Sequence, residues 1–596
     1  MTRFSFFLLS FVFSAFAVHA QIDSKKPAKE CNALLARQVV EQQADESKSV
    51  EETGKRIRIL ILAADFLWIA DETAARKYFA EAFQIAQERF KEKGFEEERN
   101  KDGLLVRQPD YRFGVIGAIA EHDAEWAKKL SEIVLKEFDE DKEKDKRRDF
   151  DKEHEVSEII GIAADVAKDN PNLALTLARR AMRYPLTNAW YFSLYEMAKN
   201  NQPLTDQIYG ELLLNYADTE IFRLLYLSAY PFGRDRIFGV EKYSLGTSIP
   251  AGFSPNQNLQ RQFLLTLFRR INRLTPENTI KSLEIKLPES VVAFTAMNEI
   301  EPLVMQQFPD LARTFSQAKI YLSSITPADA LQDARKQEDF GKSYDTPFDE
   351  KLAEVEKADE EGKLDDYQIF EIIRTAKTEE NYKQAETWID KIKEDSTRES
   401  ASNYFYFQRS KLATKEKRFE DARKYALKVP KIEHRAVLFF DIAEAKLKEP
   451  MTKLDALETL LEVYQTAQKA PDTIEKAQVF LGTAFMYEKI DHYNALGALS
   501  DAIKTANKLE NPNLFTSSVT QIIKGKDFTF FSSYAVPGFN ITETFYELSK
   551  QDFLNALTNA TNFSDKYLRT LAALATVKDC EKNDKLLKAK PKTKSN

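Results

Sequence analysis

The amino-acid sequence predicts an all-α protein: an α-solenoid of stacked helical hairpins, arranged in two blocks with an irregular loop insertion. Small residues recur on predicted helices at steps of 37, 34 and 39 residues, at Ala385, Ala422, Ala456 and Ala495. A helical hairpin of about 34 residues cannot bury its apolar stripe alone and therefore stacks on its neighbours. The near-period predicts a curved scaffold with an extended binding surface.

Composition is the second observation that favours helices. The chain has 596 residues, of which 17 are Gly, 43% are hydrophobic and 30% are charged. Glycine is scarce, and the abundant Ala, Leu, Glu and Lys lose little side-chain freedom in a helix. Alternating strand patterns with regular turn signals are missing. The formal net charge of −8 gives no indication of a nucleic-acid partner.

The first twenty residues have the pattern of a signal peptide. Arg3 precedes an apolar run from Phe4 to Val18, and Val18 and Ala20 stand at the −3 and −1 positions of a cleavage site before Gln21. We expect an exported, periplasmic or secreted protein with no transmembrane segment in the mature chain, because the apolar stretch 59–70 is short and carries Asp65.

Breaks in the helical pattern divide the rest of the chain. We expect a helical segment 21–135 with a hairpin at 55–94, a charged linker or helix 136–155, and a helical block 156–326 with an irregular loop 230–260. An acidic connector 327–365, a repeat array 366–510, a helical cap 511–580 with a loop 527–542 and a disordered basic tail 581–596 follow.

One hairpin carries a recognisable spacing of large and small residues. Its first helix has Ile59, Leu62, Ala63 and Phe66, and its second has Ala75, Phe79 and Ala82. This order resembles the tetratricopeptide repeat (TPR), although Gln87 stands where that family has its closing proline. The array 366–510 resembles it less strictly, and a generic array of helical hairpins is the alternative.

The resemblance implies a concave groove lined by the first helix of each unit. Its groove-facing positions would be Tyr367, Phe370, Arg374, Tyr404, Phe407, Lys411, Phe480 and Tyr487. Aromatic residues interleaved with cations suit an extended protein or peptide partner. The alternative is that the aromatic rings fill the space between repeats.

The irregular loop is a second candidate for partner contact. Its candidates are Arg234, Arg236, Phe238 and Tyr243. They could contact a ligand or only attach the loop to the helices beneath it.

The two cysteines, Cys31 and Cys580, lie near the two ends of the mature chain. In an oxidising compartment they could pair. In an elongated solenoid they would be too far apart to form a disulfide. The sequence leaves both possibilities open.

Sequence motifs of catalysis and metal binding are missing. Four histidines follow the predicted signal, none in a zinc-binding pattern, and the nucleotide-binding and nucleophile motifs are also missing. We therefore expect a non-catalytic scaffold with no cofactor and no metal. The alternative is a cell-envelope enzyme, similar to a glycan hydrolase, with paired carboxylates inside a helical ring.

Overall fold

The fold is known from a computed structural model. It describes residues 31, 33–94, 97–99, 105–107, 110–141, 149–239, 247–279, 288–327, 347–448, 453–526, 528–578 and 580. The predicted signal segment 1–20, the tail 581–596 and Tyr243 lie outside these residues. The structure confirms the helical fold class: most of the chain is helical, and consecutive helices pack as hairpins.

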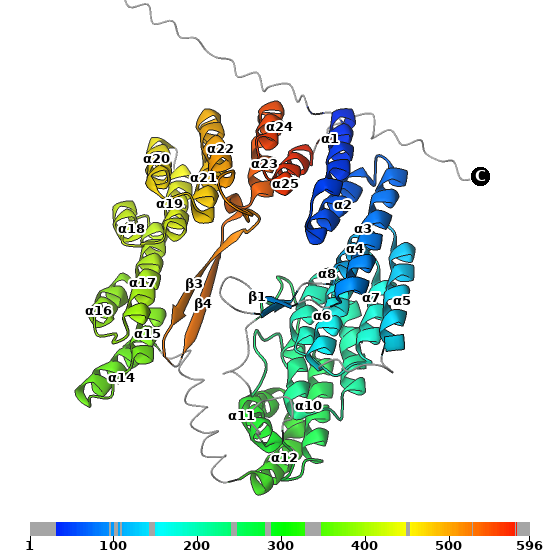
Figure 1. The fold of residues 1–596 in the computed structure, drawn as a ribbon. Helices are drawn as coiled ribbons and strands as arrows, with labels where there is room; N and C mark the ends of the chain where they lie inside the picture. Colours follow the sequence, from blue (N-terminus) through cyan, green and yellow to red (C-terminus); the bar gives the residue numbers. More distant parts are fainter. Residues whose placement is uncertain are drawn as a thin grey trace, which may run out of the picture.

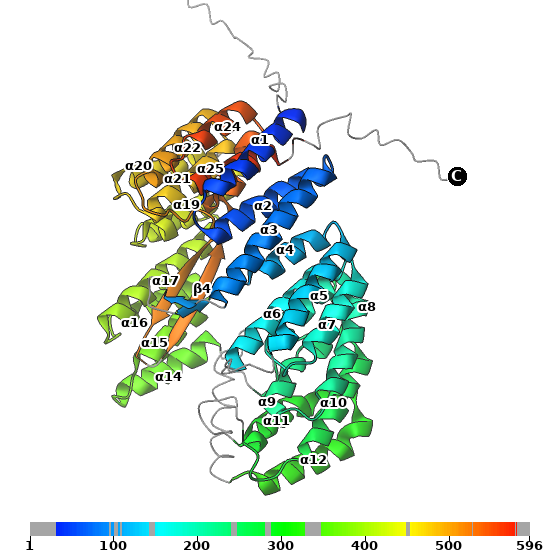
Figure 2. The same ribbon diagram turned by 45° about the vertical axis from the view of Figure 1, so that its right-hand side comes forward.

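The N-terminal arm is a stack of helices with one short two-stranded sheet (Figures 1 and 2). Its elements are α1 (Ala33–Glu46), η1 (Ser47–Ser49), α2 (Thr53–Leu67), α3 (Glu72–Lys93), β1 (Glu97–Arg99), β2 (Leu105–Arg107), α4 (Tyr111–Ala120), α5 (Ala124–Asp141), α6 (Asp149–Asp165), α7 (Pro171–Ala181), α8 (Ala189–Asn215), α9 (Ile221–Leu224), η3 (Leu225–Leu227), η4 (Tyr230–Phe232), α10 (Gln257–Ile271), α11 (Glu289–Gln307), η5 (Pro309–Leu311) and α12 (Ala312–Ile325).

The C-terminal arm contains the regular repeats and a longer antiparallel hairpin. Its elements are α14 (Phe348–Glu360), α15 (Asp366–Thr375), α16 (Glu379–Ile389), α17 (Asp395–Lys415), α18 (Phe419–Ala426), α19 (Ile432–Leu447), α20 (Lys453–Lys469), α21 (Ile474–Glu488), α22 (His492–Ala506), β3 (Ser518–Lys524), β4 (Thr529–Ala535), η7 (Pro537–Phe539), α23 (Ile541–Ser549), α24 (Phe553–Thr561) and α25 (Lys566–Val577).

The recurrent alanines lie where the helices of each hairpin approach. They fall on α16, α18, α20 and α22, the second helices of four successive hairpins, and each is completely buried. Polar caps fix where the hairpins begin: the Asp365 side chain accepts from the Gln368 backbone at the start of α15 in a capping box. The predicted period therefore reports helix packing.

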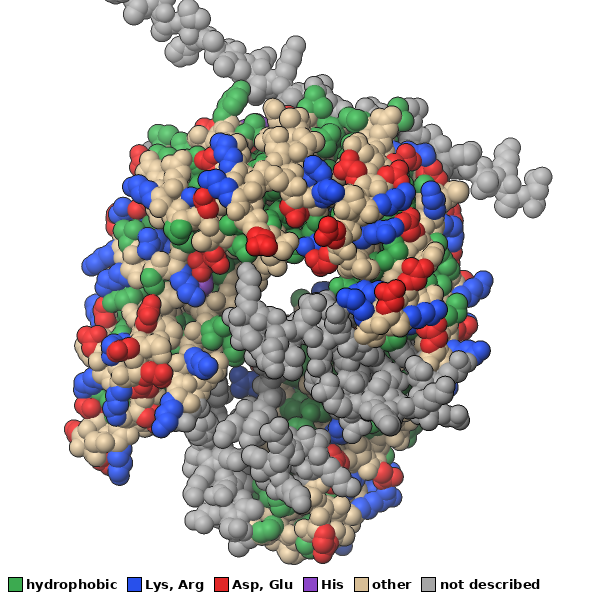
Figure 3. Space-filling model, in the orientation of Figure 1, with side chains coloured by type: hydrophobic (Ala, Val, Ile, Leu, Met, Phe, Trp, Pro, Cys, Tyr) green, Lys and Arg blue, Asp and Glu red, His purple; other side chains and the backbone are tan. Residues whose placement is uncertain are grey.

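The two ends of the chain meet, and this settles the question of the cysteines. Helices α1 and α2 pack against α25, and Cys31 and Cys580 form a disulfide with their Cα atoms 5.4 Å apart. Figure 1 shows the two arms joined through these terminal helices, and Figure 3 shows an opening in the middle of the molecule. The alternative of two distant thiols in an elongated solenoid is wrong because the first and last helices of the chain pack against each other.

Two predicted irregular segments contain regular structure. The predicted loop 527–542 contains strand β4, which pairs with β3 from Ser518↔Ala535 to Lys524↔Thr529. The predicted acidic connector 327–365 contains helix α14, whose Phe348 and Val355 are buried. Within the predicted irregular loop 230–260, η4 precedes a described stretch without helix, and α10 begins at Gln257.

Hydrophobic packing continues across the terminal junction. One buried cluster extends from Ala36 of α1 to Cys580, and a second, from Phe348 to Phe405, takes in Ile523 of β3. The hairpin is therefore part of the core of the C-terminal arm. Among the described helices, none is both long and apolar enough to span a membrane.

Candidate functional site in the concave groove

The hairpin β3–β4 lies along the concave side of the C-terminal arm, beside α15 and α17 (Figures 1 and 2). These are first helices of the repeats, the elements that carry the predicted groove residues. Side chains alternate across a strand. Val519, Gln521 and Ile523 of β3 are buried, whereas every residue of β4 is half-buried or exposed. The hairpin thus covers the groove with one face and shows its other face to solvent.

Aromatic rings hold the tip of the hairpin on α15 and α17. The ring of Phe528 lies 5.2 Å from that of Tyr367 and stacks at 5.5 Å on Phe370. The ring of Phe530 lies 5.2 Å from Phe370 and 5.5 Å from Tyr404. Such ring pairs stabilise by about 0.5–1.5 kcal/mol beyond the area they bury. Three of the predicted groove residues therefore contact the protein's own hairpin.

A second set of contacts lies further along the groove, at Tyr534 of β4. Its ring centroid is 4.5 Å from that of Phe407 and 5.5 Å from Nζ of Lys411, and its hydroxyl accepts a hydrogen bond from Gln408. Lys411 Nζ also lies 2.7 Å from Asp441 Oδ2. The predicted pairing of aromatic rings with a cation is present here. The aromatic ring beside Lys411 is that of Tyr534, which belongs to this chain and not to a partner.

The other three predicted residues lie within the repeats. Arg374 makes two hydrogen bonds of 2.8 Å to the carboxylate of Glu371. Phe480 is buried 5.5 Å from the ring of Tyr464. Tyr487 is buried, and burial raises the pKa of its hydroxyl to about 12. Phe480 and Tyr487 match the expectation that the rings fill space.

Sequence reasoning missed His434 of α19, which lies buried beside the groove. Its Nδ1 lies 3.3 Å from Asn403 Nδ2, and its ring lies edge-on to that of Phe407 at 6.2 Å. Burial, and then the charge of Lys431, lower the pKa of His434 to about 4, so the imidazole is neutral near pH 7. A buried histidine on an apolar helix face gives no signal in the sequence, because the segments packed around it are remote.

A helix–hairpin hydrogen bond fixes one edge of the sheet. The hydroxyl of Thr397, at the start of α17, donates a hydrogen bond of 2.9 Å to the carbonyl oxygen of Lys524. Thr397 thus holds β3 against α17.

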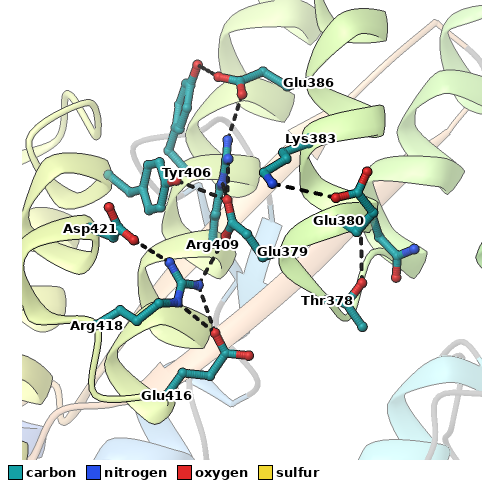
Figure 4. A network of polar contacts seen from close by, with 12 residues as sticks. Thr378, Glu379, Glu380, Lys383, Glu386, Tyr406, Arg409, Glu416, Arg418 and Asp421 are labelled. Atoms are coloured by element: carbon teal, nitrogen blue, oxygen red, sulfur yellow. Dashed lines mark hydrogen bonds and ion pairs between the residues drawn. The ribbon is translucent and has the colours of Figure 1, made fainter.

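An ion network joins α16, α17 and α18 (Figure 4). The guanidinium of Arg409, almost buried, bonds Glu379 and Glu386 and lies 4.2 Å from the ring centroid of Tyr425. Burial alone would raise the pKa of Glu379, but the hydrogen bonds and charges of Arg409, Tyr425 and Arg418 together outweigh it, and the pKa is below its ordinary value. Arg418 also bonds Glu379, at 3.1 Å. These charges pair with one another, so the network holds neighbouring repeats together and offers no unpaired charge to a ligand. The aromatic groove is therefore the candidate site.

Of the loop candidates in the N-terminal arm, Arg234 and Phe238 contact each other, and Arg234 also lies near Glu299 of α11. The guanidinium carbon of Arg234 is 3.8 Å from the ring centroid of Phe238 and one guanidinium nitrogen is 3.6 Å from Glu299 Oε2. Phe238 is buried. Arg236 lies two residues before Phe238, and Tyr243 is outside the described residues. Partner contact by this loop stays a prediction.

Carboxyl groups with raised pKa values occur outside the groove. Burial, and then the charge of Asp110, raise the pKa of Glu158 in α6 to about 6. Burial also raises the pKa of Glu488, whose Oε2 lies 2.8 Å from His492 Nδ1. Within the described residues, no group of His, Cys, Asp and Glu side chains is arranged to hold a metal ion.

No protein-family model matches the sequence, and no curated protein matches it either. Among solved structures, a "circular tandem repeat protein with novel repeat topology and enhanced subunit contact surfaces" aligns at 11% identity over 92% of this chain and 97% of its own, with a TM-score of 0.13. With so low a TM-score, we infer nothing about this chain from the similarity. The arrangement of helices defines the class: this chain is a helical repeat protein.

Proposed function

We propose that the protein is an exported, non-catalytic helical-repeat scaffold that binds a protein or peptide partner in an extended conformation. The single observation that supports this most is the hairpin in the groove. Tyr367, Phe370, Tyr404, Phe407 and Lys411, chosen as positions for an extended partner, contact an extended segment of the chain itself. The chemistry of this surface is thus suited to strands with aromatic side chains.

We further propose that the hairpins α15–α16, α17–α18, α19–α20 and α21–α22 are degenerate tetratricopeptide repeats, with α2–α3 as an earlier copy. The buried alanines on their second helices support this, as do Ala63, Ala75, Phe79 and Ala82, which are fully buried between α2 and α3.

Export to the periplasm or beyond is the second part of the proposal. The predicted signal 1–20 and the Cys31–Cys580 disulfide support it, because disulfides persist in oxidising compartments. The test is fractionation of the producing cell, followed by mass spectrometry of the protein. We expect a mature chain that begins at Gln21 with both cysteines oxidised. A cytosolic chain that retains residues 1–20 would contradict export.

Partner binding is tested by site-specific photo-crosslinking in the native envelope. A benzoylphenylalanine at Phe531, which is 64% exposed on β4, should crosslink to a discrete partner. The control places the same group at Tyr493 of α22, which is 86% exposed and lies on a second helix. We expect a crosslinked band at position 531 alone. Equal crosslinking at both positions, or none at 531, would count against the scaffold.

The enzymatic alternative has one observation in its favour. A carboxyl group with a pKa of about 6, as in Glu158, is what a general acid requires near neutral pH. The test is hydrolysis of purified cell-wall glycan by the wild-type protein and by Glu158→Gln. Release of soluble sugars that Glu158→Gln abolishes would favour the enzyme, and no release from either would favour the scaffold.

A further inference from the structure

The two edges of the β3–β4 hairpin differ in how their backbone groups are satisfied. Gly525 N donates to Phe528 O, and Val536 N donates to Ser517 O at 2.6 Å. In an antiparallel ladder, hydrogen-bonded pairs alternate with non-hydrogen-bonded ones. Between these two fixed points, the pairs 519–534, 521–532 and 523–530 are therefore hydrogen-bonded, and the residues between them point their N–H and C=O groups outward.

The outward edge of β3 lies against helix α17. Of its outward-pointing residues, Lys524 accepts a hydrogen bond from Thr397 through its carbonyl oxygen. This contact agrees with the assigned alternation, since Lys524 falls in a non-hydrogen-bonded pair. This edge is therefore attached to α17.

Within the described residues, the outward edge of β4 is unpaired. Its outward-pointing residues are Thr529, Phe531, Ser533 and Ala535, and in the part of the chain that the structure describes their N–H and C=O groups have no hydrogen-bond partner. All seven residues of β4 are uncharged, with the sequence Thr-Phe-Phe-Ser-Ser-Tyr-Ala. Natural proteins usually protect an exposed edge with charged residues, proline or a bulge. This strand has the properties of a template for another strand.

An apolar pair extends this template on the solvent face. Ile522 and Phe531 face each other across the two strands and are 53% and 64% exposed. In a non-hydrogen-bonded pair the side chains lie close together. Phe531 would contact apolar side chains of a strand placed beside β4, and Ile522 continues the apolar surface behind it.

The position of this edge selects a single strand as its occupant. The hairpin lies between the two arms, which are joined through the terminal helices (Figures 1 and 2). One added strand needs only about 4.8 Å beside β4. A second folded copy of the chain, in contrast, would have to bring its own arms into the opening.

We infer that β4 is the docking site for an extended segment of a partner polypeptide, which adds as a third strand at Thr529–Ala535 and carries uncharged, mainly apolar side chains at alternate positions. The inference rests on the proposed scaffold function and names its mode of binding. The partner's backbone pairs with the four outward-facing residues of β4, and its apolar side chains pack beside Phe531.

The test uses two variants of one residue. Ser533→Pro removes the outward N–H at the centre of the edge, and proline is tolerated on edge strands. Ser533→Ala keeps that N–H. Both lose the hydroxyl contacts to Thr520 Oγ1 at 2.9 Å and to Val519 O at 3.4 Å, so they differ in the backbone group and the proline ring. Circular dichroism and thermal melting establish that both fold.

The probe is a random dodecapeptide library displayed on phage and selected on the full mature protein. We expect selected peptides with alternating apolar residues and no central proline. Synthetic copies should bind the wild type and Ser533→Ala with similar Kd values and Ser533→Pro at least tenfold more weakly. Hydrogen exchange should show new protection of the β4 segment 528–536 on binding and little change in 518–524.

Other outcomes distinguish failure of strand addition at β4 from failure of the proposed scaffold function. Peptides that bind Ser533→Pro as well as the wild type would overturn strand addition and leave the scaffold in place. If no peptide is selected and position 531 gives no crosslink, both fail. Concentration-dependent dimerisation that Ser533→Pro abolishes would make a second copy the occupant. Protection of 528–536 in the free protein that disappears on removal of 581–596 would make the chain's own tail the occupant. Either result would overturn the inference.

Discussion

The two arms cover aromatic side chains of their helices in different ways. In the N-terminal arm, the hydroxyl of Tyr195 on α8 bonds the carbonyls of Ala229 and of Arg234, 39 residues away. In the C-terminal arm, rings on α15 and α17 pack on a hairpin, and Gln408 bonds Tyr534 across 126 residues. A nearby loop can be held by hydroxyl–carbonyl bonds without forming regular structure. The distant segment, the β3–β4 hairpin, forms a two-stranded sheet, and one edge of this sheet is unpaired within the described residues.

The largest expected effect comes from opening the junction between the arms. We expect the double variant Cys31→Ser and Cys580→Ser to lower the melting temperature, because the disulfide closes a loop across 549 residues of sequence. Loop-closure entropy gives a stabilisation of about 5 kcal/mol as an upper range. Differential scanning calorimetry should show the arms melting separately. Wild type in reductant is the control and should match the variant. An unchanged melt would mean that helix packing alone holds the two arms together.

The next prediction concerns the hairpin's contact with the repeats. Phe407→Ala should destabilise the C-terminal arm by about 3–5 kcal/mol, because the ring is fully buried and packs on Tyr534. Hydrogen exchange should speed up in 518–535. The matched control is Phe263→Ala in α10, also fully buried but in the other arm. If both variants loosen the hairpin equally, the arms are one cooperative unit and the comparison fails.

Acid should loosen the hairpin before it affects the loop of the N-terminal arm. The pKa of His434 is about 4 in the folded protein, below the ordinary value of about 6.5, so the unfolded state binds the proton first. Stability from the neutral imidazole is present above pH 6.5 and is lost as pH falls toward 4. The loss is at most about 3 kcal/mol.

The measurement is hydrogen exchange of 518–535 between pH 7 and pH 4, corrected for the intrinsic exchange rate. The groups around the imidazole are Lys431, Asn403 and Glu433, whose Oε1 lies 3.8 Å from Nε2 of His434. His434→Gln removes the titrating group and should flatten the pH dependence. An equally steep dependence in that variant would assign it to other groups.

The smallest effect is expected in the N-terminal loop. Tyr195→Phe removes a hydroxyl that bonds two carbonyls and should cost about 1–2 kcal/mol, with faster exchange in 233–239 only. Tyr493→Phe, on a ring that is 86% exposed, serves as the neutral control. Faster exchange in the β3–β4 hairpin after Tyr195→Phe would show that the stability of the hairpin is coupled to that of the N-terminal loop.

Helix packing could be predicted from the sequence because it is local. The alanines at 385, 422, 456 and 495 mark helix approach within one hairpin, and all are buried as expected. The meeting of the two arms could not be predicted, since it is a contact between helices from opposite ends of the chain, which no local pattern indicates. The pairing of Cys31 with Cys580 therefore stayed open until the fold was known.

The candidate site was predictable in part for the same reason. The repeat spacing placed Phe370, Tyr404 and Phe407 on the concave side, where they contact the hairpin. The hairpin itself has a signal in hindsight: Phe528, Phe530 and Tyr534 alternate with exposed residues. Gly538 and Pro537 nearby favoured a loop instead. No local pattern indicates that these rings pack on helices more than a hundred residues earlier.

The disulfide between the chain ends has a topological consequence. The backbone from Cys31 to Cys580, with that bond, is a closed covalent loop, and the opening in Figure 3 lies inside the molecule. A polypeptide that passes through the opening has to be threaded from a free end. If that polypeptide had a folded domain at each end, it could not leave the opening while the disulfide is intact. Reduction of one bond would turn this loop back into a linear chain.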